Sequence, residues 1–315
     1  MRGWWQDLTD LVLPADCAGC GAPRTALCPR CRTTLDGGVA RRARPVPEPA
    51  GLPVVHAVAP YAAEVRALLL AHKERGALAL AGALGVALAR AVRAGLVEGV
   101  EDAGDLGLDP GVSGLGLGAG GGAGAGPAGP TWREPLLLVP VPSARWAVRA
   151  RGHDPVRRMA LAAARELRRT GTPARVAAVL RQRRAVADQA GLDAPGRLAN
   201  LAGALEVTAG GAPLLGDGRR VVVVDDLMTT GASLAEAARA LREGVVSGVS
   251  GANGGTAVYR AITREGREER RIGSEWERTE SVHSAPEKAV SNVRARMPRA
   301  AVIAAPADSL EIIRN

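Results

Sequence analysis

The chain contains no phenylalanine, two tyrosines and only two lysines, Lys73 and Lys288, among its 315 residues. Arginine supplies the rest of the positive charge, and the formal net charge at pH 7 is +9. Such a charge favours anionic partners, either nucleic acid or small phosphorylated ligands, because arginine neutralises phosphates. However, no basic run is interleaved with aromatic residues. We therefore do not expect nucleic-acid binding to be the main function.

The chain also lacks a long apolar run. Its most apolar window, residues 78–89, is bounded by Arg75 and Arg90 and is shorter than the roughly 20 residues of a bilayer span. Residues 1–7 lack the basic start and apolar stretch of a secretory signal peptide. We therefore expect a soluble, cytoplasmic protein without a membrane span.

Cysteine is confined to two Cys-x-x-Cys pairs, formed by Cys17, Cys20, Cys28 and Cys31. Their spacing lets four thiolates surround one Zn²⁺ ion tetrahedrally. An intracellular chain is not expected to hold stable disulfides here, and a redox dithiol would normally not be duplicated. We expect residues 1–36 to form a zinc ribbon in which zinc is structural. Whether the ribbon contacts the main domain, a partner protein or nucleic acid stays open.

Three segments lack the side chains of a packed core. Residues 37–53 contain four prolines, which predicts a stiff linker. Residues 106–130 are nearly all Gly, Ala, Pro and Leu and predict a disordered insertion, because the run is too long and formless for a phosphate loop. Residues 265–315 predict a mostly disordered tail, because the apolar pairs at 302–303 and 312–313 are short.

Residues 54–264 carry strand and helix patterns and predict one α/β domain. Two helices are expected between residues 64 and 93, with Gly76 separating them. The other expected helices cover residues 157–169 and 234–242. The expected strands cover residues 54–59, 136–139, 175–180, 203–208, 221–224 and 256–261.

Two acidic residues, Asp225 and Asp226, directly follow four valines at residues 221–224. A fully apolar run of this kind is typical of a strand buried on both faces of a parallel sheet. The carboxylates would then lie at the carboxyl end of that strand, where open α/β sheets bind ligands. Neighbouring carboxylates repel each other, and ribose hydroxyls with a Mg²⁺ ion are groups that would hold them together.

A turn from strand into helix is predicted directly afterwards, at Thr229, Thr230, Gly231, Ala232 and Ser233. Such a turn presents backbone N–H groups and three hydroxyls to an anion, and glycine lets the backbone approach a phosphate closely. A purely structural interpretation is that Ser233 and Glu236 form a capping box at the start of the following helix. Both interpretations can hold. The coincidence of strand, acids and turn favours ligand binding.

Residues 221–233 resemble the ribose-phosphate signature of type I phosphoribosyltransferases. The motifs at 139–142, 149–154, 189–192 and 197–200 precede that signature and follow the four cysteines; together they resemble the ComF family of competence-associated proteins. The resemblance covers roughly residues 13–36 and 54–264, without the glycine-rich insertion and the tail. It implies a type I phosphoribosyltransferase-like fold: a twisted, mainly parallel sheet flanked by helices, with a small N-terminal zinc ribbon.

The resemblance also implies roles for the site residues. Asp225 and Asp226 would hold the ribose 2′- and 3′-hydroxyls of phosphoribosyl pyrophosphate (PRPP), together with Mg²⁺, and residues 229–233 would hold its 5-phosphate. The segment after Val141 would face the pyrophosphate. Cations beside the leaving group assist such chemistry, and the candidates are Arg145, Arg149 and Arg151.

Two stretches near this site need separate interpretation. The family usually has Arg-Gly-Phe-Asn-Gln where this chain has Arg-Gly-His-Asp-Pro at residues 151–155, so this loop departs from the family pattern. Residues 72–75, His-Lys-Glu-Arg, are interpreted as a solvated helix end, although the family often carries a lysine near this position.

Two functions fit these motifs. The first is an Mg²⁺-dependent phosphoribosyltransferase that moves the phosphoribosyl group from PRPP to a nitrogen acceptor such as a base or ammonia. The second is a non-catalytic adaptor in DNA uptake, which senses PRPP or a nucleotide and contacts a partner protein or single-stranded DNA through the zinc ribbon. The complete ribose-phosphate signature at residues 221–233 favours the transferase. The lack of a recognisable pocket for an acceptor base favours the adaptor.

Overall fold

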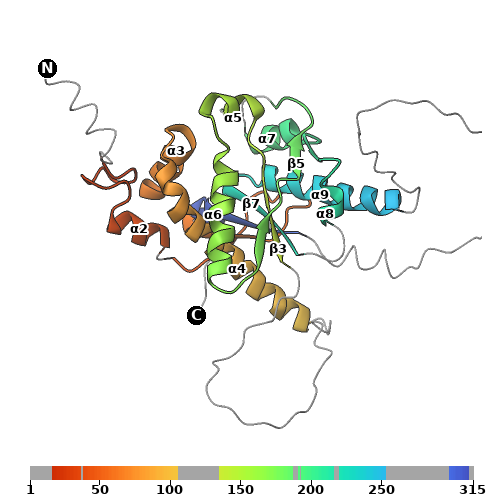
Figure 1. Cartoon of the computed structure of the whole chain (residues 1–315), viewed down its shortest axis with the longest axis horizontal. Coiled ribbons are helices and arrows are strands. Elements are labelled where there is room, and N and C mark those ends of the chain that lie inside the picture. The colour runs from red at the N-terminus through yellow and green to blue at the C-terminus, as the bar shows by residue number, and fades with distance from the viewer. Residues whose placement is uncertain are drawn as a thin grey trace, which may run out of the picture.

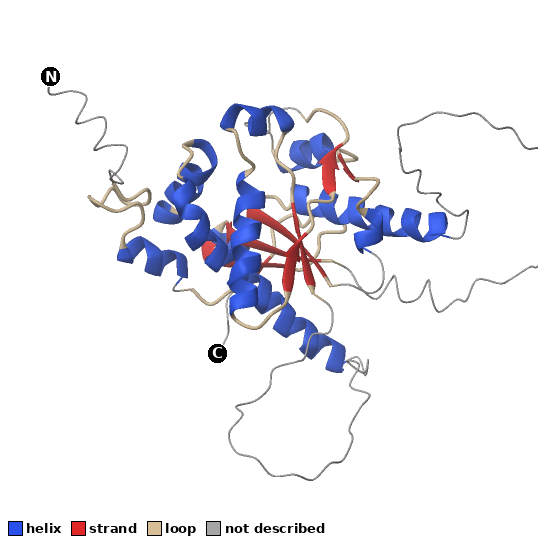
Figure 2. Cartoon of the chain, viewed as in Figure 1, coloured by secondary structure: helices blue, strands red, loops and turns tan. Residues whose placement is uncertain are grey.

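The computed structural model describes residues 16–36, 38–105, 135–186, 191, 193–215, 220–252 and 298–311. Their strands are β1 Arg41–Ala43, β2 Val55–Pro60, β3 Leu136–Pro140, β4 Ala174–Val176, β5 Leu180–Gln182, β6 Leu205–Val207, β7 Val221–Leu227 and β8 Arg299–Ala305. Six of them form one sheet in the order β1-β2-β8-β7-β3-β4, and β5 pairs with β6 in a separate two-stranded sheet. Figure 2 shows the larger sheet in red among blue helices.

The described helices are α2 Pro29–Asp36, α3 Ala63–Glu74, α4 Ala81–Asp105, α5 Arg145–Arg151, α6 Pro155–Arg169, α7 Ala194–Leu201, α8 Ala212–Leu215 and α9 Ala232–Ala252, with 3-10 turns at Leu78–Leu80 and Ala307–Ser309. In Figure 1, α5 and α7 lie near the same end of the sheet, whereas α4 extends toward the opposite end. The predicted α/β class is therefore confirmed.

The sheet is mostly parallel. From β2 through β8, β7 and β3 to β4, every neighbouring pair runs in parallel, and β1 is antiparallel to β2. Helices connect the parallel strands, as crossover connections require. The prediction of a mainly parallel sheet flanked by helices is therefore confirmed.

Alternating side chains place each face of the sheet in a different core. On one face, Leu136 and Leu138 of β3 pack in a cluster with residues of α3, α4 and α6. On the other face, Leu137 and Val139 pack in a cluster with residues of α9, such as Leu234. Because β7 is covered on both faces, its carboxyl end is the part of the strand from which polar groups can leave the core.

Gly85 lies where α4 crosses α6. A methyl group at this position would collide with the side chain of Ala162, and its carbon would also lie 2.9 Å from the backbone nitrogen of Ala163. Overpacking of this kind costs about 1–3 kcal/mol, so Gly85→Ala is expected to lower the free energy of unfolding by that amount. Urea denaturation measures the change.

Gly82→Ala in the same helix is the matched control. No atom lies within 4 Å of a methyl group at Gly82. Because alanine favours helices over glycine, this change is expected to leave the free energy of unfolding unchanged or to raise it by up to about 1 kcal/mol. Equal losses in the two variants would contradict the tight crossing of α4 and α6.

Strand β8 corrects the prediction of a mostly disordered tail at residues 298–311; the rest of the predicted tail lies outside the described residues. Arg299–Ala305 lies between β2 and β7 in the middle of the sheet, with Val302 paired with both Ala57 and Asp225. From Ala300 to Ala305 every side chain is buried. Alanine has a weak strand preference, and the apolar pair at 302–303 is short, so the local pattern carried little strand signal. Small side chains suit this central position because helices cover both faces.

The predicted linker is also partly ordered into the sheet. Residues 41–43 form β1, in which Arg42 pairs with His56 of β2. Farther along, Leu52 and Pro45 approach Gly231 closely. The interpretation of residues 37–53 as a linker between separate units is therefore wrong for these residues. The prolines terminate the edge strand, a position where the missing N–H groups are tolerated.

Other sequence predictions hold with changed boundaries. The strand predicted at 175–180 is two short strands, β4 and β5, and the helix predicted at 234–242 extends over Ala232–Ala252. The insertion predicted at 106–130 and the strand predicted at 256–261 lie outside the described residues.

The most apolar stretch extends beyond the predicted window of residues 78–89. Leu78–Glu98 is long and apolar enough to cross a membrane by length and composition, and most of it is buried inside the fold. It contributes Leu84 and Leu88 to the core shared with the sheet. This burial is consistent with the core helix of a soluble protein.

Candidate functional site

The site is built at the carboxyl end of β7, where Asp225 and Asp226 are both buried. Asp225 pairs in register with Val302 of β8, so its backbone belongs to the sheet. The backbone N–H of Asp226 donates to Oδ1 of Asp225 at 2.8 Å. The two carboxyl groups are thus held next to each other in a poorly solvated position.

A lysine from α3 lies against this pair. Nζ of Lys73 donates to Oδ2 of Asp226 at 3.0 Å, and the Lys73 side chain is 37% exposed. The carboxylate of Asp226 raises the pKa of Lys73 and outweighs the opposing effect of burial. Lys73 therefore stays charged and brings a cation to the end of β7.

The two carboxyl groups respond differently to their surroundings. Burial, together with the charge of Asp226, raises the pKa of Asp225 well above its ordinary value. Burial also acts to raise the pKa of Asp226, but the charge of Lys73 and hydrogen bonds lower it below its ordinary value. In the free protein Asp226 is thus the ionised member of the pair, and Asp225 takes up a proton more readily.

The prediction of a solvated helix end at residues 72–75 holds for Glu74 and Arg75, which are exposed at the end of α3, and is wrong for His72 and Lys73. His72 is 1% exposed, and Lys73 forms the ion pair described above. One signal could have drawn attention to Lys73: it is one of only two lysines in a chain that otherwise uses arginine for positive charge.

The loop from Thr229 to Ser233 joins β7 to α9. Gly231 has a φ of +77°, a conformation that favours glycine, and its carbonyl accepts the N–H of Ala235 at 2.9 Å. α9 therefore begins directly after Gly231, and its first N–H groups lie in this loop. Among the described residues, the hydroxyls of Thr230 and Ser233 form no hydrogen bond. The loop thus offers free donors at the positive end of a long helix.

The alternative capping box is contradicted by this geometry. Because α9 begins at Ala232, Ser233 lies inside the first turn instead of capping it. The side chain of Glu236 accepts the backbone N–H of Leu205 at 2.8 Å and pairs with Arg239. The Ser233 hydroxyl is therefore not engaged in capping the helix.

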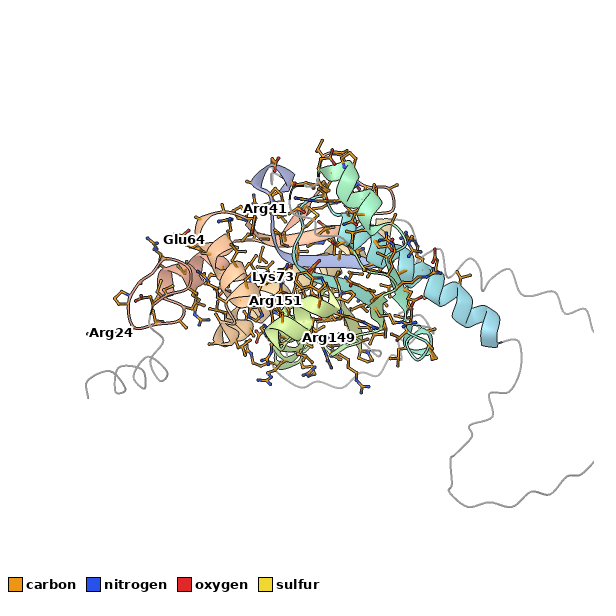
Figure 3. The ribbon with its side chains drawn as sticks, turned by 90° about the horizontal axis from the view of Figure 1, so that it is seen from above. Arg24, Arg41, Glu64, Lys73, Arg149 and Arg151 are labelled. Atoms are coloured by element: carbon orange, nitrogen blue, oxygen red, sulfur yellow. The ribbon has the colours of Figure 1, made fainter. Side chains whose placement is uncertain are left out.

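The predicted pyrophosphate-side arginines, Arg145, Arg149 and Arg151, all lie on α5, which follows β3. Arg151 donates to Oε1 of Glu74 at 3.0 Å and so ties α5 to the end of α3, next to Lys73. Arg145 and Arg149 are exposed. Figure 3 labels Lys73, Arg149 and Arg151 in a view from above. Of the three arginines, Arg151 is the one joined to the element that reaches the aspartate pair.

The residues that depart from the ComF pattern form the connection between α5 and α6. Gly152 ends α5 with a φ of +73°, and Asp154 caps α6 by accepting the N–H of Arg157 at 3.1 Å. Pro155 then occupies the first turn of α6, where its missing N–H is tolerated. This part of the loop therefore begins a helix with local capping groups.

The four cysteines form a second candidate site. One ligand atom from each of Cys17, Cys20, Cys28 and Cys31 lies within 4.8 Å of the others, an arrangement that could hold one metal ion. Cys20 is exposed and the other three are buried. The backbone N–H of Cys28 donates to Sγ of Cys17 at 3.3 Å. The sequence prediction that these four residues come together is confirmed.

The surroundings of the cysteines favour a thiolate. Burial acts to raise the pKa of Cys17, but backbone N–H groups of Cys28, Cys20 and Gly19 lower it to about 6. Burial and the neighbouring thiols instead raise the pKa of Cys31. A divalent cation among the four sulfurs would favour the thiolate form of all of them.

The cysteine cluster packs against the main core. Cys17, Cys28 and Cys31 belong to the same buried cluster as Leu68 of α3. A side chain on Gly19 would have its first carbon 2.8 Å from Sγ of Cys31 and 3.3 Å from Leu68. This close approach needs glycine, and it seats the cysteine segment directly on α3.

Neither a comparison with protein families nor a comparison with curated proteins found a match for this chain. The geometry of the two sites is therefore the basis on which a function can be assigned.

Proposed function

We propose that this chain is a ComF-type protein with a type I phosphoribosyltransferase-like fold, which binds PRPP and transfers its phosphoribosyl group to a nitrogen acceptor. One observation carries the proposal. Two buried aspartates lie near the carboxyl end of a central strand, and the loop after them presents the N–H groups of α9 and hydroxyls that have no partner among the described residues. Acceptors for sugar hydroxyls and donors for a phosphate are thus adjacent in the chain.

The ribose is assigned to the aspartates. Carboxylates accept two hydrogen bonds from a vicinal diol, and the buried position strengthens these bonds. Thr229 to Ser233 then receive the 5-phosphate, and the positive φ of Gly231 forms the turn that brings the first N–H groups of α9 to it. Within the described part of the chain, Asp226 forms an ion pair with Lys73 and no cation forms an ion pair with Asp225, which supports Asp225 as an acceptor for a ribose hydroxyl.

A divalent cation fits the same end of β7. Aspartate oxygens are the hard donors that Mg²⁺ prefers, and Asp225 and Asp226 are the residues that would hold the ion. When bound, it would neutralise charge on the departing pyrophosphate. Arg151 and the exposed Arg145 and Arg149 on α5 are the residues of this chain that we assign to the pyrophosphate side.

In the transfer, the bond from ribose C1 to the pyrophosphate oxygen breaks and a bond from C1 to the acceptor nitrogen forms. The pyrophosphate leaves with the electron pair, and the proton lost by the acceptor nitrogen passes to the departing pyrophosphate or to water. Positive charge develops at C1, so anionic groups close to the sugar stabilise the transition state. Asp226 is suited to this role, because it is the ionised member of the pair.

We further propose that the four cysteines bind one structural Zn²⁺ ion. Four thiolates close the coordination shell and leave no position for a substrate. The buried packing of Cys31 against α3 supports a role in folding. The ion would then join the N-terminal segment to the helix that carries Lys73.

Isothermal titration with PRPP and with ribose 5-phosphate, each with and without Mg²⁺, tests the proposed function. We expect micromolar or tighter binding of PRPP that weakens when Mg²⁺ is removed, because the ion would neutralise charge on the ligand and Asp225 and Asp226 would help to hold it. A screen for pyrophosphate release with bases, amines and ammonia then tests transfer. If the protein binds neither PRPP nor ribose 5-phosphate, the proposal is contradicted. If it binds PRPP but releases no pyrophosphate with any acceptor, the adaptor function is favoured.

A further inference from the structure

Arg197 reaches the phosphate loop from a different element. It lies on α7, and its Nη1 donates to the Thr229 hydroxyl oxygen at 3.4 Å. α7 packs against α9, the helix that follows the loop. A guanidinium is therefore positioned beside the first residue of the loop, although it lies 32 residues away in the chain.

This guanidinium is poorly satisfied within the described part of the protein. Its Nε is shielded from solvent and has no hydrogen-bond partner. No carboxylate of a described residue forms an ion pair with it. By contrast, Lys73 is paired with Asp226 and Arg151 with Glu74. A shielded, unpaired donor on a cation is costly unless an anion completes the site.

The position of Arg197 is fixed by both ends of α7. At the start, Oδ1 of Asp193 accepts the N–H of Gly196 at 2.8 Å. At the end, Nη2 of Arg184 donates to the carbonyls of Asn200 and Ala202 at 2.8 and 2.9 Å. Because both ends are held, the backbone of α7 needs little further ordering when the Arg197 side chain interacts with a ligand.

We propose that Arg197 binds the phosphate of the sugar ligand together with the loop from Thr229 to Ser233, so that the phosphate is held between α7 and the start of α9. This inference rests on the proposed function and deepens it. A long bond to a neutral hydroxyl would be replaced by charge-assisted bonds to phosphate oxygens, which are shorter and stronger. The site would therefore select a terminal phosphate monoester over the unphosphorylated sugar.

Isothermal titration of Arg197→Ala with ribose 5-phosphate and with PRPP tests the role. A hydrogen bond to a charged group contributes about 1.5–3 kcal/mol, so Kd for both ligands is expected to rise about 10- to 150-fold. Arg197→Lys keeps the charge without the planar fork and is expected to lose a smaller part of the affinity. Thermal unfolding of each variant establishes that α7 is retained.

Arg165→Ala is the matched control. It removes the same charge from an exposed position on α6, toward the end of that helix remote from the phosphate loop. We expect its Kd to stay within about twofold of the unmodified protein, because exposed charges at that distance are screened.

The outcomes separate this inference from the function on which it rests. If Arg197→Ala binds ribose 5-phosphate as tightly as the unmodified protein, while replacing Asp225 and Asp226 abolishes binding, the role of Arg197 is overturned and the proposed function stands. An equal loss in Arg165→Ala would also overturn it, because the effect would be one of net charge. If the unmodified protein binds neither ligand, both proposals fail.

Discussion

Replacing both aspartates by asparagine, D225N/D226N, is expected to weaken PRPP binding by at least about 100-fold, because two hydrogen bonds to charged groups contribute about 1.5–3 kcal/mol each. The change keeps the shape of both side chains, which are buried at the end of β7. It removes the charge that attracts the ribose hydroxyls and Mg²⁺. Isothermal titration with Mg²⁺ present measures the loss.

The two single variants, D225N and D226N, are expected to differ in their effect on the free energy of unfolding. Burial raises the pKa of Asp225, so an amide resembles the form that this side chain readily adopts in the free protein. D225N should therefore leave the free energy of unfolding nearly unchanged. D226N instead leaves Lys73 without its partner and is expected to lower that free energy by about 1–2 kcal/mol, below the value for a fully buried pair because Lys73 is partly exposed.

The pH dependence of unfolding provides a further check on Asp226. Its pKa is lowered in the folded protein, so its contribution to stability is present above the ordinary aspartate pKa of about 3.9 and is lost as the pH falls through the lower, folded value. D226N should lack this acid-dependent loss. Unchanged PRPP affinity in the double variant would contradict the assignment of the ribose to these residues.

Removing one zinc ligand by Cys31→Ser is expected to reduce bound zinc from one ion per chain to far below one. Structural zinc binding contributes about 10 kcal/mol or more in zinc-finger peptides, so the free energy of unfolding of the N-terminal segment should fall by at least about 3 kcal/mol. Cys31 is fully buried and packs in the cluster that contains Leu68. Elemental analysis and guanidinium denaturation measure the two effects.

Arg32→Ala provides the control for this experiment. Arg32 is next to Cys31 in the sequence, and its side chain is exposed. Removing this exposed side chain should change stability by less than about 1 kcal/mol and leave zinc bound. A protein that carries no zinc after purification in zinc-containing medium, or equal stability of Cys31→Ser, would contradict a structural metal site.

The parts predicted well from sequence depend on short-range patterns. The strand at 221–224, the two acids and the turn at Gly231 occur within thirteen consecutive residues, and each has a local physical cause. The four cysteines are likewise close in the chain, and their spacing restricts how they can meet. The helices around Gly76 and at residues 157–169 follow from apolar periodicity.

The parts missed depend on contacts between distant segments. Lys73 and Asp226 are 153 residues apart, and no pattern around Lys73 indicates its partner. β8 is made mostly of alanine, which becomes a suitable strand residue because β2, β7 and two helical layers surround it. Pro45 and Leu52 were assigned to a linker because their packing on Gly231 leaves no local trace.

The sequence by itself determined the α/β class and the cysteine cluster. It also determined that two carboxylates are followed by a loop with hydroxyl and N–H groups. Backbone preferences and side-chain spacing act over a few residues, so these features can be predicted locally. Only the tertiary structure decided which cations face those groups. Lys73 comes from α3 and contacts Asp226, whereas Arg197 comes from α7 and contacts Thr229. Such an arrangement depends on long-range packing, which the local sequence does not encode.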